Sequence, residues 1–245
     1  GHPHPSPRTI FRTSARQPGW RRVVMLCPFA HGDLRQVAAW DTVLPHCDHY
    51  LAITGNHWMR TLPDSPFAHW QSRMTQLDLA VDRRDFPPVK ATFRPPGRRR
   101  LLYIGSTAWV KNPRYLAELA RRSPDLSFSW IGTGRCPISG LRRFGPQDFT
   151  QPAALQLVAD HDFIITVGSS DANPTVILEG MAWGLIPVCT PQSGYEGHAG
   201  IPNIPLNRPA EATAVLRELQ QWPDERLRDV QRANWRALDE HFNWD

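Results

Sequence analysis

Long apolar runs and paired cysteines are both missing from this sequence of 245 residues. No stretch reaches the roughly 20 apolar residues that a membrane-spanning helix needs, and the N-terminus lacks the hydrophobic core of a signal peptide. The four cysteines are scattered and form no CxxC pair, which argues against a zinc ribbon and against a disulfide framework. We therefore expect a cytoplasmic protein whose cysteines are reduced.

Motifs of nucleic-acid binding are missing as well. The sequence contains no zinc finger, no RNP-like aromatic motif and no lysine-rich arm, so nucleic acid is not an expected partner. The formal net charge of +5 comes from arginine clusters and favours anionic partners. Charge alone leaves three interpretations open, namely nucleotide phosphates, peripheral contact with the inner face of an anionic membrane, and a solvated basic surface.

Convincing metal ligands are also scarce. His46, Cys47 and His49 stand close together where a helix is expected to meet a strand, but the group lacks a fourth ligand. We expect these side chains to pack locally and predict no metal site.

Apolar residues are plentiful enough for a core, because hydrophobic residues make up 41% of the chain. The length suits two domains. In the first, the apolar runs Val23–Leu26 and Tyr50–Thr54 predict buried strands, and the spacing of apolar residues over Leu34–Leu44 predicts a helix between them. Met74–Leu79 predicts a further strand.

Proline is dense between Phe86 and Gly97, with four prolines in that segment. Proline stiffens an extended chain, so we interpret this segment as an interdomain linker. The predicted division is 1–95 for a first α/β domain, with a loose tail over 1–20, and 96–245 for a second domain.

The second domain alternates between strand and helix patterns, which predicts a doubly wound α/β fold with a parallel sheet. The expected strands are Leu101–Ile104, Leu126–Ile131, Leu141–Phe144, Phe163–Val167 and Ile186–Cys189. The expected helices are Pro113–Arg121, Pro152–Asp160, Pro174–Trp183, Pro209–Trp222 and Pro223–His241.

The most informative stretch runs from Gly168 to Val188 and joins a strand, a polar loop, a helix and another strand. Asn173 suits the N-cap of the helix and Pro174 its first residue. The free N–H groups of the first turn would then favour a diphosphate. Glu179 lies about 7 Å further along the helix, a span that suits the ribose of the same nucleotide.

This stretch resembles the signature of the retaining GT-B glycosyltransferases of family 4, in which two acidic residues bracket seven others. Asp171 and Glu179 occupy the two acidic positions. The first position is usually Glu, so Asp171 is a shortened version, whereas Glu179 fits without change. The resemblance implies that Asp171 and Glu179 are catalytic residues and that Glu179 binds the ribose. It also implies that the loop from Asp171 through Asn173 and Pro174 to Thr175 wraps the donor sugar and diphosphate.

A second match covers Leu101–Pro113 and resembles the first strand and turn of the family's donor domain. Gly105 occupies the turn and Lys111 the position of a family lysine, whereas Ser106 stands where an arginine is expected. By the resemblance these three residues contact the donor, and Lys111 is catalytic because a fixed cation stabilises charge on the leaving diphosphate. Three arginines are candidates to replace the missing one: Arg135, Arg142 and Arg143.

Weaker matches extend over most of the rest of the chain. Arg143–Gly145 resembles the strand before the nucleobase loop, which makes Arg143 a candidate for nucleotide binding. Segments near residues 46–54 and 77–86 resemble the end of the family's N-terminal domain, and residues 241–245 resemble the segment that precedes the family's final helix. Family members are longer, so we expect the first domain to be partial. His31 follows the first strand and is a candidate for the acceptor side.

The resemblance implies a hexosyltransferase that moves a sugar from a nucleotide diphosphate sugar to an unknown acceptor with retention. No cofactor beyond the donor and no metal are expected. NAD is not expected either, because Gly132 and Gly134 lack the third glycine of a dinucleotide-binding turn. Two alternatives remain, namely a noncatalytic or degenerate nucleotide-sugar-binding module and a GT-B nucleotide-sugar epimerase.

Overall fold

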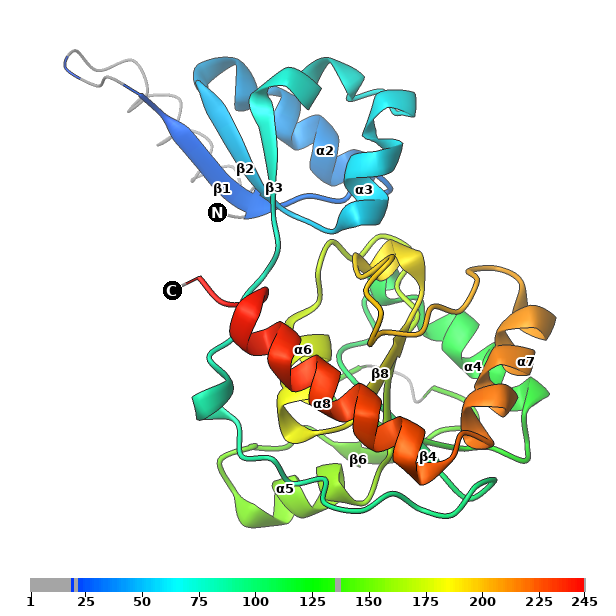
Figure 1. The fold of residues 1–245 in the computed structure, drawn as a ribbon. Coiled ribbons are helices and arrows are strands. Elements are labelled where there is room, and N and C mark those ends of the chain that lie inside the picture. Colours follow the sequence, from blue (N-terminus) through cyan, green and yellow to red (C-terminus); the bar gives the residue numbers. More distant parts are fainter. Residues whose placement is uncertain (1–18, 20–21, 135–137, 245) are drawn as a thin grey trace.

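The computed structural model describes residues 19, 22–134 and 138–244, and it contains two α/β units (Figure 1). The smaller unit has a parallel sheet of order β1-β2-β3. Its strands are β1 Val24–Pro28, β2 His49–Ile53 and β3 Met74–Leu77, and its α-helices are α2 Leu34–Asp41 and α3 Asn56–Thr61. The prediction for the tail over 1–20 lies outside the described residues, apart from Gly19.

The larger unit has a parallel sheet of five strands in the order β6-β5-β4-β7-β8. The strands are β4 Arg100–Ile104, β5 Ser127–Ile131, β6 Arg142–Gly145, β7 Phe163–Thr166 and β8 Ile186–Cys189. The helices are α4 Pro113–Arg122, α5 Pro152–Ala159, α6 Thr175–Trp183, α7 Pro209–Gln220 and α8 Asp224–Glu240. The doubly wound α/β architecture is therefore confirmed.

Short 3-10 helices connect several of these elements: η1 Leu44–His46, η2 Leu62–Asp64, η3 Ala68–Arg73, η4 Arg83–Asp85, η5 Trp109–Lys111 and η6 Pro191–Ser193. None of the helices within 22–134 and 138–244 combines the length and the apolarity needed to cross a membrane. A cytoplasmic location stays a prediction.

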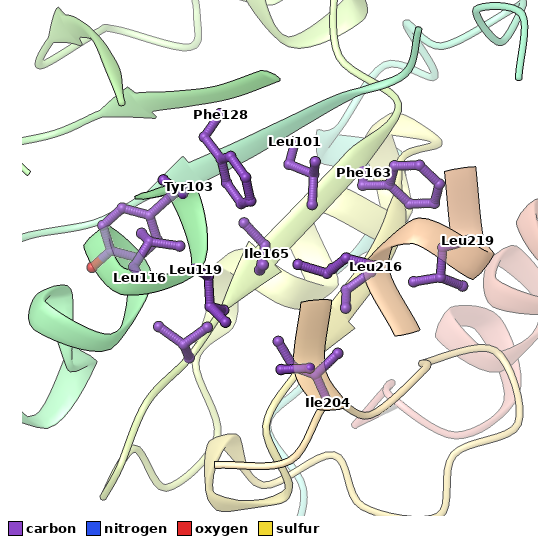
Figure 2. Packing of buried hydrophobic residues seen from close by; sticks show 14 of the residues in the cluster. Leu101, Tyr103, Leu116, Leu119, Phe128, Phe163, Ile165, Ile204, Leu216 and Leu219 are labelled. Atoms are coloured by element: carbon purple, nitrogen blue, oxygen red, sulfur yellow. The ribbon is translucent and has the colours of Figure 1, made fainter. Parts of the chain in front are cut away.

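Both faces of β4, β7 and β8 are buried, which explains why these strands are largely apolar, whereas Arg142 and Arg143 of the edge strand β6 are exposed. On one face, Leu101 and Ile165 pack against side chains from α4 and α7, such as Leu119 and Leu216 (Figure 2). Leu102 points to the opposite face and belongs to the cluster that includes α6 and α8. The helices on the two faces hold the strand ends, and hence the loops that follow them, in fixed positions.

Among the described residues, helices cover only one face of the smaller sheet. Met25 and Cys27 of β1 are buried with Val37 of α2, whereas Val24 and Leu26 are 49% and 43% exposed. The prediction of buried strands is therefore wrong for one face of β1. Successive side chains of a strand point to opposite faces, and the helices of this unit cover only one of them.

The proline-rich segment is packed against the larger unit, which corrects its interpretation as a linker. The N–H groups of Val89 and Lys90 donate to the carbonyl of Trp183, at 3.1 and 2.9 Å. Lys90 Nζ lies 2.8 Å from Asp162, and these two side chains are 3% and 0% exposed. Phe93 joins the main core. The segment is extended because of its prolines, but buried contacts hold it in place. The division at residue 95 stays a prediction.

Candidate functional site

The carboxyl ends of β4 and β7 lie side by side in the centre of the larger sheet. The strand order reverses direction between them, and ligands of open α/β sheets bind in the crevice at such a point. The loop after β4 carries Gly105 and Ser106, and the loop after β7 carries Asp171. The fold therefore brings the two matched segments of the sequence together.

The turn after β4 requires glycine. Gly105 has a φ of +158°, and a Cβ there would lie 2.7 Å from the hydroxyl of Tyr103. A Cβ on Gly132 would lie 2.0 Å from the carbonyl oxygen of Gly105, so the turns after β4 and β5 are in close contact. The Ser106 hydroxyl accepts a hydrogen bond from the N–H of Ala108, at 3.3 Å, and thus holds its own loop.

Lys111 and Asp171 form an ion pair at this strand edge. Lys111 Nζ lies 2.6 Å from Asp171 Oδ2, and the two side chains are 27% and 13% exposed. The N–H of Asp171 donates to the carbonyl of Gln192, which fixes the backbone of the loop. Burial raises the pKa of Asp171, and the ammonium group of Lys111 opposes that rise. The two residues neutralise each other in the unliganded site.

Helix α6 begins one residue later than the sequence predicts. Pro174 is the N-cap, with extended backbone angles, and Thr175 is the first helical residue. The side chain of proline has no oxygen that could accept hydrogen bonds from the N–H groups of the first turn, and this turn has no side-chain cap. The same offset occurs at Pro223, which precedes α8. The predicted cap, Asn173, is wrong.

Asn173 instead holds the loop in place through its side chain. Its Oδ1 accepts hydrogen bonds from the hydroxyl of Tyr195, at 2.8 Å, and from the N–H of Leu79, at 3.3 Å. Tyr195 is fully buried and also donates to the carbonyl of Pro174. The start of α6 is therefore positioned by residues from the loop after β8 and from the segment that follows β3.

A cleft of about 420 Å³ lies between the two units at this point. From the larger unit it is lined by five of the predicted site residues: Lys111, Asp171, Asn173, Pro174 and Thr175. The smaller unit contributes Pro28, Ala30 and Ile53. Its volume lies within the usual range of small-molecule sites. Gly105, Ser106, Arg143, Glu179 and His31 do not line it.

Glu179 lies outside this cleft, in the middle of α6 and partly buried. Burial raises the pKa of its carboxyl group. No residue within the described part of the chain forms a hydrogen bond or an ion pair with it. A partly buried carboxylate without a partner is unfavourable, and a ligand that donates hydrogen bonds would relieve that cost.

The arginines proposed to replace the missing cation differ in their surroundings. The guanidinium of Arg143 lies 4.8 Å from the ring centre of Trp130, whose indole N–H donates to the carbonyl of Gly105 at 2.8 Å. Arg143 is thus next to the turn after β4. Arg142 stacks instead on Phe144. The candidate Arg135 lies outside the described residues.

His31 lies behind the cleft rather than on its wall. One ring nitrogen lies 2.7 Å from the hydroxyl of Thr61, and the ring packs edge-on against Trp58. Burial and, less strongly, His57 lower the pKa of His31. Trp58 in turn donates from its indole N–H to the carbonyl of Asp171, at 3.4 Å. Trp58 therefore links His31 to the loop that carries Asp171.

The contacts between the two units were missed by the sequence analysis. Trp58 packs with Ala30 and Ala172, and the carboxylate of Glu196 accepts hydrogen bonds from Arg60 at 2.9 and 3.1 Å. A Cβ on Gly55 would lie only 1.4 Å from the carbonyl oxygen of Gly194. No local pattern predicts the contacts of Ala172, Gly194 and Glu196 with the smaller unit, because their partners are more than a hundred residues away in the chain.

The histidine and cysteine group near residue 47 does not converge. Cys47 donates to the carbonyl of Val43, and a ring nitrogen of His49 lies 2.8 Å from the hydroxyl of Thr75. These side chains pack locally.

Sequence comparison identifies no relative of this chain, since no family model and no curated protein match it. Solved structures do match in fold. A glycosyltransferase of Rickettsia africae aligns with a TM-score of 0.62 and 14% identity, over 80% of this chain and 59% of that protein. HepE of Anabaena, solved with UDP and glucose, aligns with a TM-score of 0.63 and 11% identity, over 88% and 64%.

Sucrose-phosphate synthase of Thermosynechococcus elongatus aligns with a TM-score of 0.64 and 13% identity, over 97% of this chain and 62% of that protein. The chain thus spans about six tenths of the length of these structures. Its fold is that of the GT-B glycosyltransferases. Identities of this size establish the fold and leave the activity open.

Proposed function

We propose that this chain is the donor-binding part of a retaining hexosyltransferase, similar to those of family 4. It would move a sugar from a nucleotide diphosphate sugar to an acceptor in the cleft between the two units. The observation that carries the proposal is the Lys111–Asp171 ion pair. It lies where the strand order reverses, on the wall of the cleft and beside the uncapped start of α6.

We propose that each of these groups has a separate role when a donor binds. The diphosphate lies at the start of α6, where free N–H groups and the helix dipole favour negative charge. Lys111 exchanges its contact with Asp171 for a contact with the diphosphate, so its charge stabilises the leaving group as the sugar bond breaks. Asp171, released from that pair, accepts hydrogen bonds from sugar hydroxyl groups. Glu179 accepts those of the ribose.

Retention is the stereochemical part of the proposal. The acceptor would attack from the face on which the diphosphate leaves, with the sugar held by the loop between Asp171 and Thr175. The product would then keep the anomeric configuration of the donor. Proton NMR of the product of the full-length protein distinguishes retention from inversion.

Calorimetry tests the proposed donor site. The nucleotides UDP, GDP and ADP and their glucose conjugates are titrated into the wild type, into Glu179→Ala and into Glu225→Ala. Glu225 is an exposed helical glutamate that serves as the matched control. We expect one nucleotide to bind the wild type and the control equally, and to bind Glu179→Ala at least tenfold more weakly. Equal affinity for all three proteins would contradict the assignment of Glu179.

A noncatalytic donor-binding module is the second candidate, and Ser106 favours it. Serine is neutral, so it supplies no positive charge where the resemblance expects an arginine, and its hydroxyl accepts a hydrogen bond from its own loop. This candidate predicts that the full-length protein binds a nucleotide sugar but neither transfers nor hydrolyses it. Release of nucleoside diphosphate from a bound donor would exclude it.

A further inference from the structure

Three side chains from distant parts of the sequence meet where the chain crosses from the smaller unit to the larger one. Asp78 directly follows β3, His198 lies in the loop between β8 and α7, and His241 directly follows α8. The end of α8 lies next to the crossing segment (Figure 1). One ligand atom from each residue lies within 4.8 Å of the other two. These residues are separate from the lining of the cleft.

The three groups have the chemistry of metal ligands. His241 Nε2 lies 3.2 Å from Asp78 Oδ2, and the rings of His198 and His241 have their centres 5.5 Å apart. The Nε2 atom of His198 is shielded from solvent and has no hydrogen-bond partner among the described residues.

We propose that Asp78, His198 and His241 bind a divalent transition-metal ion such as Zn²⁺, with water as the fourth ligand. Two imidazoles and one carboxylate are a common ligand set for such ions. Bonds of about 2.0 to 2.2 Å place the ligand atoms of a tetrahedral site roughly 3.3 Å apart. The distance of 3.2 Å between Asp78 Oδ2 and His241 Nε2 already has about this value, and a ligand atom of His198 lies within 4.8 Å of both residues' ligand atoms.

Hydrogen bonds from neighbouring groups fix the orientation of the Asp78 carboxylate, as is usual for residues that bind a metal ion. Side-chain amides of Gln76 and Asn173 donate to Asp78 Oδ1, each at 3.4 Å, and leave Oδ2 for the ion. The indole N–H of Trp244 donates to the backbone carbonyl of Asp78 at 2.9 Å. A bound ion would tie the crossing segment and the end of α8 to the loop that carries His198.

Zinc titration by calorimetry tests this site. All proteins carry His2→Asn and His4→Asn, because these two residues near the N-terminus could bind zinc independently. The matched control is His69→Asn. Its imidazole also faces an aspartate, Asp41 at 3.3 Å, and is 58% exposed, against 55% for His241. We expect one Zn²⁺ per chain in the parent and in His69→Asn, and at least tenfold weaker binding in His241→Asn and Asp78→Asn.

Thermal unfolding provides a second readout. Zinc at about 100 times its dissociation constant should raise the Tm of the parent and of His69→Asn by about 5 to 10 °C. It should leave the Tm of His241→Asn nearly unchanged, and this exposed position tolerates substitution without loss of the fold. Failure of the parent to bind zinc, or equal affinities and Tm shifts in the His241 and His69 variants, would overturn the proposal.

Cobalt tests the ligand set itself. Co²⁺ added to the parent should give visible absorption bands of a four-coordinate site with nitrogen and oxygen ligands, and His198→Asn should lack them. Bands of equal intensity in His198→Asn would show that His198 is not a ligand. None of these measurements involves a nucleotide, so their outcome is independent of the proposed transferase function.

Discussion

At the scale of single residues, the proposed donor site contains two carboxylates in different situations, one on the wall of the cleft and one outside it. Asp171 is paired with Lys111, whereas Glu179 is partly buried without a partner among the described residues. The chain has only two lysines, Lys90 and Lys111, and each forms an ion pair with a buried or nearly buried aspartate. Lys111 is the one whose partner faces the cleft, so it alone can change partners when an anion arrives.

The Lys111–Asp171 pair should be visible as coupling in a double-mutant cycle. Lys111→Met leaves a largely buried carboxylate unpaired, and we expect it to lower the free energy of unfolding by about 1 to 3 kcal/mol at pH 8. Adding Asp171→Asn removes that charge and should restore most of the loss. Urea unfolding of the two single variants and the double variant measures the coupling. Additive effects would mean that the two groups do not interact.

The raised pKa of Glu179 predicts a dependence of stability on pH. A carboxyl group whose pKa is higher in the folded state stabilises the fold when protonated. That contribution is complete below the pKa of the unfolded chain and is lost as pH rises through the folded-state pKa. The Glu179→Gln variant has no carboxyl group to ionise, so it does not lose this stability as the pH rises. Its Tm should therefore match that of the wild type near pH 4 and exceed it near pH 8.

The control for this measurement is Glu225→Gln, at an exposed helical position. Its Tm difference from the wild type should not change with pH in the same way. A constant difference between Glu179→Gln and the wild type from pH 4 to pH 8 would contradict the assigned burial of Glu179. If Glu179→Gln is more stable but binds the donor more weakly, Glu179 lowers the stability of the fold and serves donor binding.

At the scale of elements, the segment from Leu79 to Phe93 contributes to the larger unit. Its backbone forms hydrogen bonds with the end of α6, and Lys90 forms an ion pair with Asp162. Its apolar side chains pack into the hydrophobic clusters on both faces of the larger sheet. Asp162 also accepts hydrogen bonds from the N–H groups of Arg94 and Arg100. One carboxylate thus joins the proline-rich segment to β4 and β7.

Lys90 should therefore be important for stability. Lys90→Met leaves Asp162 without its charged partner in a fully buried position, and we expect a loss of about 3 kcal/mol in urea unfolding. Arg84→Met is the control, because Arg84 pairs with Asp82 at the surface and its replacement should cost much less. Similar losses in the two variants would indicate that this segment is loosely attached in solution.

At the scale of the whole molecule, the cleft exists because the two units touch. Gly55 and Gly194 bring two backbones into contact, and Arg60 and Glu196 form an ion pair next to them. Trp58 reaches from the smaller unit to the carbonyl of Asp171. The arrangement places apolar residues of the smaller unit opposite the loop that we propose binds the donor.

Gly55→Ala should prevent this approach. The backbone of Gly55 is extended, with φ of −111°, so alanine strains no backbone angle there, but its Cβ would overlap the carbonyl of Gly194. We expect the units to separate, with a larger radius of gyration in small-angle X-ray scattering. Donor binding should weaken as well if the cleft is the site. The same radius of gyration as the wild type would mean that the contact is not maintained in solution.

The parts of the molecule that the sequence by itself determined are those that depend on near neighbours along the chain. Alternating strand and helix patterns predicted the five strands and five helices of the larger unit, with ends shifted by a few residues. Asp171 and Glu179 lie in one loop and the helix directly after it, so their spacing depends on local structure alone. Gly105 and Lys111 both lie in the segment directly after β4. Local sequence is sufficient in each case, because the strand ends alone bring these segments to one edge of the sheet.

Tertiary structure alone decided the rest, because the partners are far apart in the chain. Lys111 and Asp171 are 60 residues apart, and Arg60 and Glu196 are 136 apart. Asparagine is a residue type that suits an N-cap, yet the side chain of Asn173 accepts hydrogen bonds from Tyr195 and Leu79 instead. Proline marks an extended segment but does not reveal which surface it covers. Which partner a polar side chain binds and which surface a segment covers depend on the burial of apolar area and on hydrogen bonds to buried polar groups. Both depend on the complete fold.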